Sequence, residues 1–397
     1  MEQTANETNL LEQLSRRYHV PASRIRIVRA PYRICPLGAH IDHQLGPVTA
    51  MAIDQAVLLA FAPTDSREVR LASVDFPGEA RFAIDCVPDR VPGDWGNFAR
   101  GAVRVLAQAF SLQTGICGIL AGRFSAGGLS SSAAVSVALL LALEDANGLR
   151  VSDQENILLG QAIENEYLGL NSGILDQSAI LLSRRDHLTV IDCQTLRHEL
   201  IARPPSMPPY AILIAFSGLT KALVGTDYNR RVAECAEAAA SLLAAVGRPG
   251  AKPVLRSIAP EEYAAHRHVL EGPSARRAAH FFSEMERVVQ GAEAWRRGDL
   301  ATVGRLMTAS GESSIRNYEC GSAPLVELYH ILIGIEGVYG ARFSGAGFRG
   351  CCVALVDEAA ASQAAASVRR AYHQRHPELA GRAITVVCHS DDGARIL

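Results

Sequence analysis

The sequence predicts an α+β protein built from two domains. Its 397 residues exceed what one ordinary hydrophobic core holds, and two domains of about 200 residues each are the natural expectation. Long runs of helical pattern and of strand pattern both occur, which indicates a mixed architecture. Four prolines fall within residues 203–209 and mark a boundary. We therefore expect an N-terminal domain over 1–205 and a C-terminal domain over 206–397.

The first half of the chain alternates between the two patterns. Apolar or alternating segments predict strands at 25–29, 51–60, 69–84 (with a Pro-Gly turn inside it) and 187–192. A loop rich in Pro, Gly and His is expected over 31–46. Helical periodicity and end signals predict helices at 6–18, 97–110, 131–146 and 152–168.

The second half of the chain is mostly helical. A strand is expected at 210–216, and helical segments fill most of 229–337. Residues 340–356 have the pattern of a strand, a Gly-rich turn and a second strand. No internal repeat is visible, so the two halves are expected to differ in structure.

The composition excludes several classes of function. Basic and acidic residues nearly balance, at 39 and 41, and the net charge of -2 gives no reason to expect nucleic acid or a membrane surface as a partner. The first ten residues are polar, unlike a signal peptide, so we expect a cytoplasmic protein. The longest apolar run, 133–143, is shorter than the roughly 20 residues that span a bilayer.

Cysteine and lysine usage narrows the chemistry further. The nine cysteines show neither CxxC nor Cys/His ligand spacing, which predicts reduced and mostly buried thiols without a metal or redox role. The chain has two lysines, Lys221 and Lys252, so a catalytic lysine has few candidates. No G-x-x-x-x-G-K-[ST] motif occurs, which excludes a P-loop kinase.

The most specific local feature is the segment Ser125-Ala-Gly-Gly-Leu-Ser-Ser-Ser-Ala-Ala134. Gly127 and Gly128 allow the backbone to turn closely around a ligand, and a long helix begins directly after them. Free N–H groups and the dipole at such a helix N-terminus attract phosphate, and serine hydroxyls can bind phosphate oxygens or Mg²⁺. Taken alone, the segment fits a simple helix N-cap with two spare serines equally well.

Three further motifs accompany this segment along the chain. They are Pro31-Tyr-Arg-Ile-Cys-Pro-Leu-Gly-Ala-His-Ile-Asp-His43, Gly173-Ile-Leu-Asp-Gln177 and Gly340-Ala-Arg-Phe-Ser-Gly-Ala-Gly-Phe-Arg-Gly350. Together the four resemble the motifs of the GHMP kinases, the superfamily of galactokinase, homoserine kinase, mevalonate kinase and phosphomevalonate kinase. The resemblance is to its galactokinase-like members. It implies a two-domain GHMP kinase fold with the active site between the domains, and ATP with Mg²⁺ as the phosphoryl donor.

The third motif contains Gly345-x-Gly-x-x-Gly350, which on its own matches a dinucleotide-binding fingerprint. That fingerprint needs a strand before it and a helix after it. Residues 351–356 have a strand pattern instead. We therefore interpret the motif as a glycine-lined turn at the active site.

The resemblance also assigns roles to residues. It implies Asp176 as the general base for the anomeric hydroxyl and Arg33 as the cation that stabilises the developing charge. It implies Ser130 and Glu164 as the pair that holds Mg²⁺. The implied ATP-binding residues are Gly127, Gly128, Leu129, Ser130, Ser131, Ser132, Ala133, Gly345 and Gly347.

The sugar motif departs from that of galactokinases. Where they carry Gly-Glu-His-x-Asp-Tyr, with the Glu bonding the 6-hydroxyl, this chain has Ala39 in place of the Glu and His43 in place of the Tyr. A carboxylate on carbon 6 would repel the Glu by about 1–4 kcal/mol for unit charges ~4 Å apart. Ala39 therefore makes room for a uronic acid.

Blocks 30–44, 173–183 and 344–352 resemble galacturonokinases more closely than galactokinases proper. The resemblance implies D-galacturonate and ATP as substrates and the 1-phosphate as product. The implied sugar-binding residues are Ala39, His40, Asp42, His43 and Tyr228.

Alternatives stay open at this point. The group that binds the carboxylate could be His43, Tyr228 or Lys221. A galactokinase of altered specificity and activity on glucuronate are both compatible with the motifs. A non-catalytic sugar sensor is disfavoured because Arg33, Asp176 and the serine cluster are all present.

Overall fold

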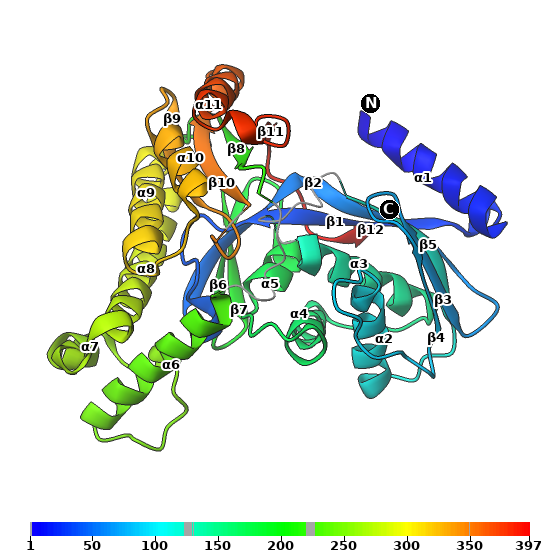
Figure 1. Ribbon diagram of the computed structural model, residues 1–397, viewed down its shortest axis with the longest axis horizontal. Helices are drawn as coiled ribbons and strands as arrows, with labels where there is room; N and C mark the ends of the chain where they lie inside the picture. Colours follow the sequence, from blue (N-terminus) through cyan, green and yellow to red (C-terminus); the bar gives the residue numbers. More distant parts are fainter. Residues whose placement is uncertain (1, 123–128, 130, 220–226, 349) are drawn as a thin grey trace.

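The computed structural model describes residues 2–122, 129, 131–219, 227–348 and 350–397. Two β-sheets account for the strands, and helices pack on both of them. Figure 1 shows the larger sheet with its helices on the right and the smaller sheet with a group of long helices on the left. The mixture of helix and sheet confirms the α+β expectation.

Eight strands form the first sheet, in the order β12-β1-β2-β5-β3-β4, with β6 and β7 attached through β2. Their bounds are β1 (Arg26–Ile34), β2 (Pro47–Pro63), β3 (Glu68–Ser73), β4 (Glu79–Ala83), β5 (Ile116–Gly122), β6 (His187–Asp192), β7 (Arg197–Ala202) and β12 (Arg395–Ile396). The β3–β5 pair is parallel and the other pairs are antiparallel. The long strand β2 pairs with β1 and β5 over most of its length and with β6 at its start.

Side chains on β2 alternate between two helical layers, as the period of two in a strand requires. Val57 and Leu59 enter the main core, whereas Leu58 faces the opposite side and packs in a smaller core with Leu14. The helix on that smaller core is α1 (Glu2–Tyr18). The helices on the main face are α2 (Asn97–Ala109), α3 (Ser131–Ala146), α4 (Asp153–Ala162) and α5 (Leu175–Leu182). Figure 1 shows α1 and α2 on opposite sides of the strands.

Four antiparallel strands form the second sheet, in the order β11-β8-β10-β9. Their bounds are β8 (Tyr210–Phe216), β9 (Val338–Phe343), β10 (Cys351–Asp357) and β11 (Ile384–Cys388). The helices of this half are α6 (Tyr228–Ala245), α7 (Pro260–His266), α8 (Gly272–Arg296), α9 (Leu300–Arg316), α10 (Ala323–Ile333) and α11 (Ala361–Arg375). α9 packs along β9, and α8 packs on α9 and also reaches β2, β6 and β7 of the first sheet. α8 therefore joins the two halves.

The expected helix over 131–146 and the expected strands over 187–192 and 210–216 are confirmed with the same bounds. One expectation was wrong: β1 continues to Ile34, because it stays paired with β2 through that residue, so Arg33 lies on a strand and not in a loop. The expected helix over 152–168 is present, but its last part is a π-helical turn, η3 (Ile163–Leu168).

The chain changes sheets between the end of β7 at Ala202 and the start of β8 at Tyr210. Its last strand, β12, returns to pair with β1. The domain boundary at residue 205 stays a prediction. Among the helices that the structure describes, none is both long and apolar enough to cross a membrane.

Candidate active site

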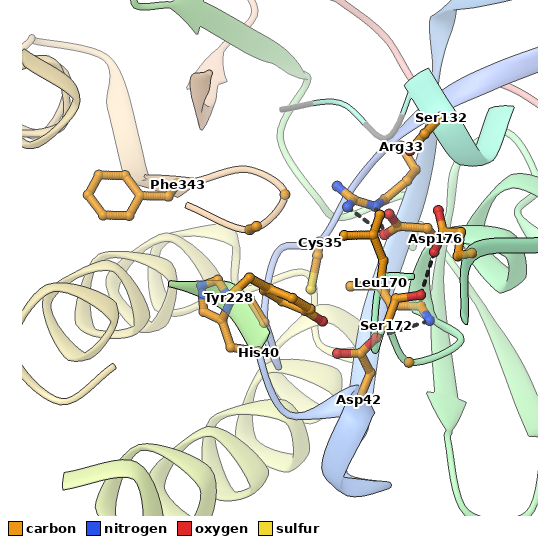
Figure 2. A pocket seen from close by; sticks show the side chains of 16 residues that line it. Arg33, Cys35, His40, Asp42, Ser132, Leu170, Ser172, Asp176, Tyr228 and Phe343 are labelled. Carbon is orange, nitrogen blue, oxygen red and sulfur yellow. Dashed lines mark hydrogen bonds and ion pairs between the residues drawn. The ribbon is translucent and has the colours of Figure 1, made fainter. Parts of the chain in front are cut away.

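A cleft of about 710 Å³, open to solvent at its mouth, lies between the two halves of the chain. Its walls come from β1 and the loop after it, from the turn before α5, from the start of α6 and from the end of β9. Figure 2 shows the side chains converging on this space. The lining residues are Arg33, Cys35, Ala39, His40, Asp42, Ser132, Glu164, Leu170, Ser172, Gly173, Leu175, Asp176, Tyr228, Phe343, Gly345 and Ala346.

A charged pair, Arg33 and Asp176, forms one wall of the cleft (Figure 2). The Nε and Nη2 atoms of Arg33 both donate to Asp176 Oδ1, at 2.7 and 2.5 Å. Arg33 also reaches Ser344 Oγ through Nη1 at 3.5 Å, so its guanidinium is held from both halves of the chain. Asp176 lies in the first turn of α5, where the helix dipole favours a carboxylate. Its side chain is 27% exposed, against 2% for Arg33, so Asp176 faces the cleft.

A second carboxylate, Asp42 of the sugar motif, begins the short 3₁₀ turn Asp42–Gln44. Burial and, after it, the nearby charge of Asp176 raise the pKa of Asp42 to about 6, while the hydrogen bond from the Leu175 N–H partly offsets both. The space beside Asp42 is filled by the backbone of Gly173. A Cβ atom at Gly173 would lie 2.3 Å from Asp42 Oδ2, so this turn requires glycine.

A third carboxylate, Glu164, lies in the π-helical turn η3, a feature often found at functional sites. Ser172 Oγ donates to Glu164 Oε2 at 2.5 Å. Burial raises the pKa of Glu164, and so does the charge of Asp176. Among the described residues, three carboxylates and one arginine, Arg33, therefore line the cleft. This excess of negative charge suits a hard cation such as Mg²⁺, for which oxygen ligands are the fit donors.

The protein alone does not build a complete metal cage within its described part. No group of three His, Cys, Asp or Glu side chains is placed to hold a metal ion there. Glu164 is available as a ligand, and Ser130, its expected partner, lies outside the described residues.

The wall opposite the carboxylates is aromatic and uncharged. His40 stacks on Tyr318, with ring centroids 4.3 Å apart and planes 12° apart. Burial lowers the pKa of His40 well below its usual value, so this ring is neutral. His40 also has a φ of 66°, a left-handed conformation that is uncommon outside glycine and is often found at binding sites. Figure 2 shows the ring of Tyr228 on the same wall, pointing toward Asp42.

His43, predicted to bind the sugar, is absent from the described lining of the cleft. Its Nε2 lies 3.1 Å from the Tyr318 hydroxyl, and its Nδ1 lies 3.3 Å from Gln44 Nε2. Burial lowers the pKa of His43 to about 4. His43 is thus a neutral ring that supports Tyr318 from behind the wall, and its direct contact with a sugar stays a prediction.

The residues predicted to bind ATP fall into three groups. Ser132 and Gly345 line the cleft, and Gly347 packs against His40 at its edge. Ser131 is the first residue of α3, while Leu129 and Ala133 are buried beside it. Gly127, Gly128 and Ser130 lie outside the described residues.

Several cleft residues escaped sequence reasoning. Leu170 and Ser172 line the space outside every motif, and Cys35, Phe343 and Ala346 lie within motifs but were given no role. Ser172 carried one usable signal, because it directly precedes the Gly173 motif. The others are small or apolar side chains whose position depends on the fold.

Comparisons with known proteins agree with this geometry. Family models match residues 97–184 (GHMP kinases N terminal domain), 292–374 (GHMP kinases C terminal) and 12–63 (Galactokinase galactose-binding signature). The chain is 50% identical to the galacturonokinase of Arabidopsis thaliana over 94% of each chain, and 36% identical to a galactokinase of Roseiflexus over 92% of each. The structure of Lactococcus lactis galactokinase complexed with galactose matches at a TM-score of 0.88, with 29% identity over 98% of each chain.

The chain therefore belongs to the GHMP kinase family. Its two halves carry the N-terminal and C-terminal modules of that family, with the cleft between them. Within the family it is a sugar kinase, similar to galacturonokinase and to galactokinase.

Proposed function

We propose that the enzyme phosphorylates D-galacturonate at the anomeric C1 hydroxyl, with Mg-ATP as donor, to give galacturonate 1-phosphate. The observation that carries the proposal is Ala39, a small uncharged residue that lines the cleft beside His40. The 50% identity to a galacturonokinase supports it, because the likeness extends over 94% of both chains.

Asp176 acts as the general base in the proposed reaction. The C1 oxygen attacks the γ-phosphorus of ATP, the bond from that phosphorus to the bridging oxygen breaks, and ADP leaves. The proton of the C1 hydroxyl passes to the Asp176 carboxylate, which the ion pair with Arg33 keeps aimed into the cleft. The Arg33 guanidinium would also stabilise the negative charge that develops on the transferred group.

Glu164, together with Ser130, would hold the Mg²⁺ ion. The bound ion would neutralise phosphate oxygens and so lower the barrier to attack. Glu164 is kept in place by the Ser172 hydroxyl and by the π-helical turn. Asp42 and Tyr228 would hold the ring hydroxyls, since both line the cleft near Asp176 (Figure 2).

Charge repulsion explains why Ala39 favours a uronate. A Glu side chain at this position would place a second negative charge close to the substrate carboxylate. Two such charges ~4 Å apart repel by about 1 kcal/mol in water and about 4 kcal/mol at an effective dielectric of 20. This range corresponds to a loss of roughly 5-fold to 1000-fold in kcat/KM.

The experiment is to measure kcat/KM with D-galacturonate and with D-galactose for the wild type, Ala39→Glu and Ala39→Gln. The Gln variant is the matched control, because it adds the same volume without the charge. We expect the wild type to prefer galacturonate, and Ala39→Glu to lose far more of that preference than Ala39→Gln. Equal losses in both variants would mean that size, and not charge, determines the substrate.

Galactokinase activity is the second candidate. It is favoured by the 36% identity to a galactokinase and by the structural match to an enzyme complexed with galactose. The same kinetic comparison decides between the two, since a wild-type preference for galactose would overturn the galacturonate proposal and leave the sugar kinase assignment intact.

A further inference from the structure

A buried arginine, Arg342 on β9, lies beside the part of the cleft that contains Ala39. Its side chain is fully buried. Nη1 donates to Ser310 Oγ at 2.8 Å and Nε donates to the Phe343 carbonyl at 3.1 Å. Nη2 has no hydrogen-bond partner among the described residues. A buried guanidinium N–H without an acceptor is costly unless a ligand supplies one.

Arg342 is outside the described lining of the cleft, but its charge acts on two residues that line it. The next residue, Phe343, lines the cleft. The pKa of His40 is lowered most by burial, then by the neighbouring His280, and then by the positive charge of Arg342. Burial raises the pKa of the Cys35 thiol, and the charge of Arg342 lowers it. Both His40 and Cys35 line the cleft. Arg342 thus acts on the side chains that flank Ala39.

The charges around Arg342 do not cancel. The fully buried carboxylate of Glu284 lies 4.0 Å from Arg342 Nη1, but it also accepts from Arg287 Nε at 2.6 Å. The Gly38 N–H donates to the same carboxylate at 2.8 Å, which attaches this cluster to the sugar motif. Two guanidinium groups therefore share one carboxylate.

Histidines near the cluster do not change this balance. His280 donates through Nε2 to the Ala39 carbonyl at 3.0 Å, and its Nδ1 lies 2.9 Å from Ser313 Oγ. Burial lowers the pKa of His280 to about 4 and that of His43 to about 4, so both rings are neutral near pH 7. The cluster of Arg342, Glu284 and Arg287 keeps one net positive charge behind Ala39.

We propose that Arg342 is the residue that selects a carboxylate on carbon 6 of the substrate, by supplying the positive charge of the buried cluster behind Ala39. The inference rests on the proposed function and names its specificity determinant. Among the described residues, Arg33 is the one arginine that lines the cleft, and it binds Asp176. Lys221, the other candidate from the sequence, lies outside the described residues. His43 is neutral, with both ring nitrogens in contact with other side chains.

The test compares kcat/KM for D-galacturonate and D-galactose across three arginine variants. In Arg342→Met, the galacturonate-to-galactose ratio should fall by about tenfold or more, mainly through a higher KM for galacturonate. Arg342→Lys keeps the charge and should retain most of the ratio. The control is Arg29→Met, which removes another buried, ion-paired arginine on the same strand as Arg33, outside the described lining of the cleft, and should leave the ratio unchanged.

A fourth variant works in the opposite direction. Glu284→Gln keeps an acceptor for the Gly38 N–H but removes the negative charge, so the cluster becomes more positive. The ratio should rise, a gain that damage to the fold cannot produce. The Glu284→Gln variant also tests the inference if Arg342→Met does not fold.

The outcomes separate the two proposals. If the wild type prefers galacturonate while Arg342→Met keeps the wild-type ratio, or Glu284→Gln fails to raise it, the proposed function stands and Arg342 is not the determinant. If the wild type prefers galactose, the proposed function fails and the assignment of Arg342 fails with it.

Discussion

Gly173→Ala should cripple sugar phosphorylation without unfolding the protein. A Cβ atom at residue 173 would lie 2.3 Å from Asp42 Oδ2, 2.5 Å from its Cγ and 2.7 Å from its backbone carbonyl carbon. Ordinary van der Waals contact begins at 3.4 Å. One of the two segments must therefore move by about 1 Å, and a shift of Asp42 would displace a carboxylate that lines the cleft and accepts from the Leu175 N–H.

A shift of this size at a substrate-positioning group costs on the order of 100-fold in rate. We expect kcat/KM to fall by about that factor for both galacturonate and galactose, because Asp42 is expected to bind ring hydroxyls that the two sugars share. Steady-state kinetics with both sugars measures the loss, and thermal unfolding measures any cost to the fold. Gly250→Ala is the control, since a Cβ atom there has no neighbour within 4 Å.

A fully active Gly173→Ala enzyme would refute this reasoning. It would mean that the turn before α5 adjusts without moving Asp42, or that Asp42 does not hold the sugar. If both the activity and the unfolding temperature fell strongly, the glycine would instead have a structural role.

Three further predictions follow from the carboxylates. Asp176→Asn should lower kcat by about 10²- to 10⁴-fold with little change in the KM for the sugar, as loss of a general base requires; steady-state kinetics measures it. Glu164→Gln should raise the Mg²⁺ concentration needed for half-maximal activity by about tenfold or more, in a Mg²⁺ titration at fixed ATP. Burial raises the pKa of Glu144, on α3, from 4.5 to about 7. Between these pH values the folded chain holds a proton on Glu144 that the unfolded chain has lost. The free energy of unfolding therefore falls as the pH rises from 4.5 to about 7. Glu144→Gln should abolish this fall, worth at most about 3 kcal/mol, when denaturant unfolding at pH 5 is compared with pH 8.

Helix α3 and strand β8 could be predicted from the sequence because each is long or apolar enough to show its own pattern. Helix α5 could not, because Leu175–Leu182 is a short apolar run without a cap, and such a run has no periodicity to separate helix from strand. Strand β7 shows one buried residue, Ile201, so its pattern carries little information. The extension of β1 to Arg33 depends on its pairing with β2, which local sequence does not encode.

The candidate site also has a part that the sequence predicts and a part that it does not. Arg33, Asp42 and Asp176 lie in motifs whose order along the chain identifies them, and the structure brings them to one cleft. The second layer behind that cleft has no such signature. Gly38 and Glu284 are 246 residues apart and meet through a hydrogen bond that only the packing of α8 against the first sheet creates. Arg342 belongs to a predicted motif, but its charge balance depends on that same packing.

The distribution of charge along the cleft gives the bound sugar a direction. Glu164 and Asp176 are acidic and lie where Mg²⁺ and the phosphoryl group are expected, whereas the Arg342 cluster lies behind Ala39. A uronate that entered in reverse would bring its carboxylate to the acidic end, at a cost of about 1–4 kcal/mol for a single charge pair ~4 Å apart. In the proposed forward direction the carboxylate would lie over the positive cluster and the C1 hydroxyl would reach Asp176. The same charge that would select a uronate would therefore also select its anomeric hydroxyl as the group that is phosphorylated.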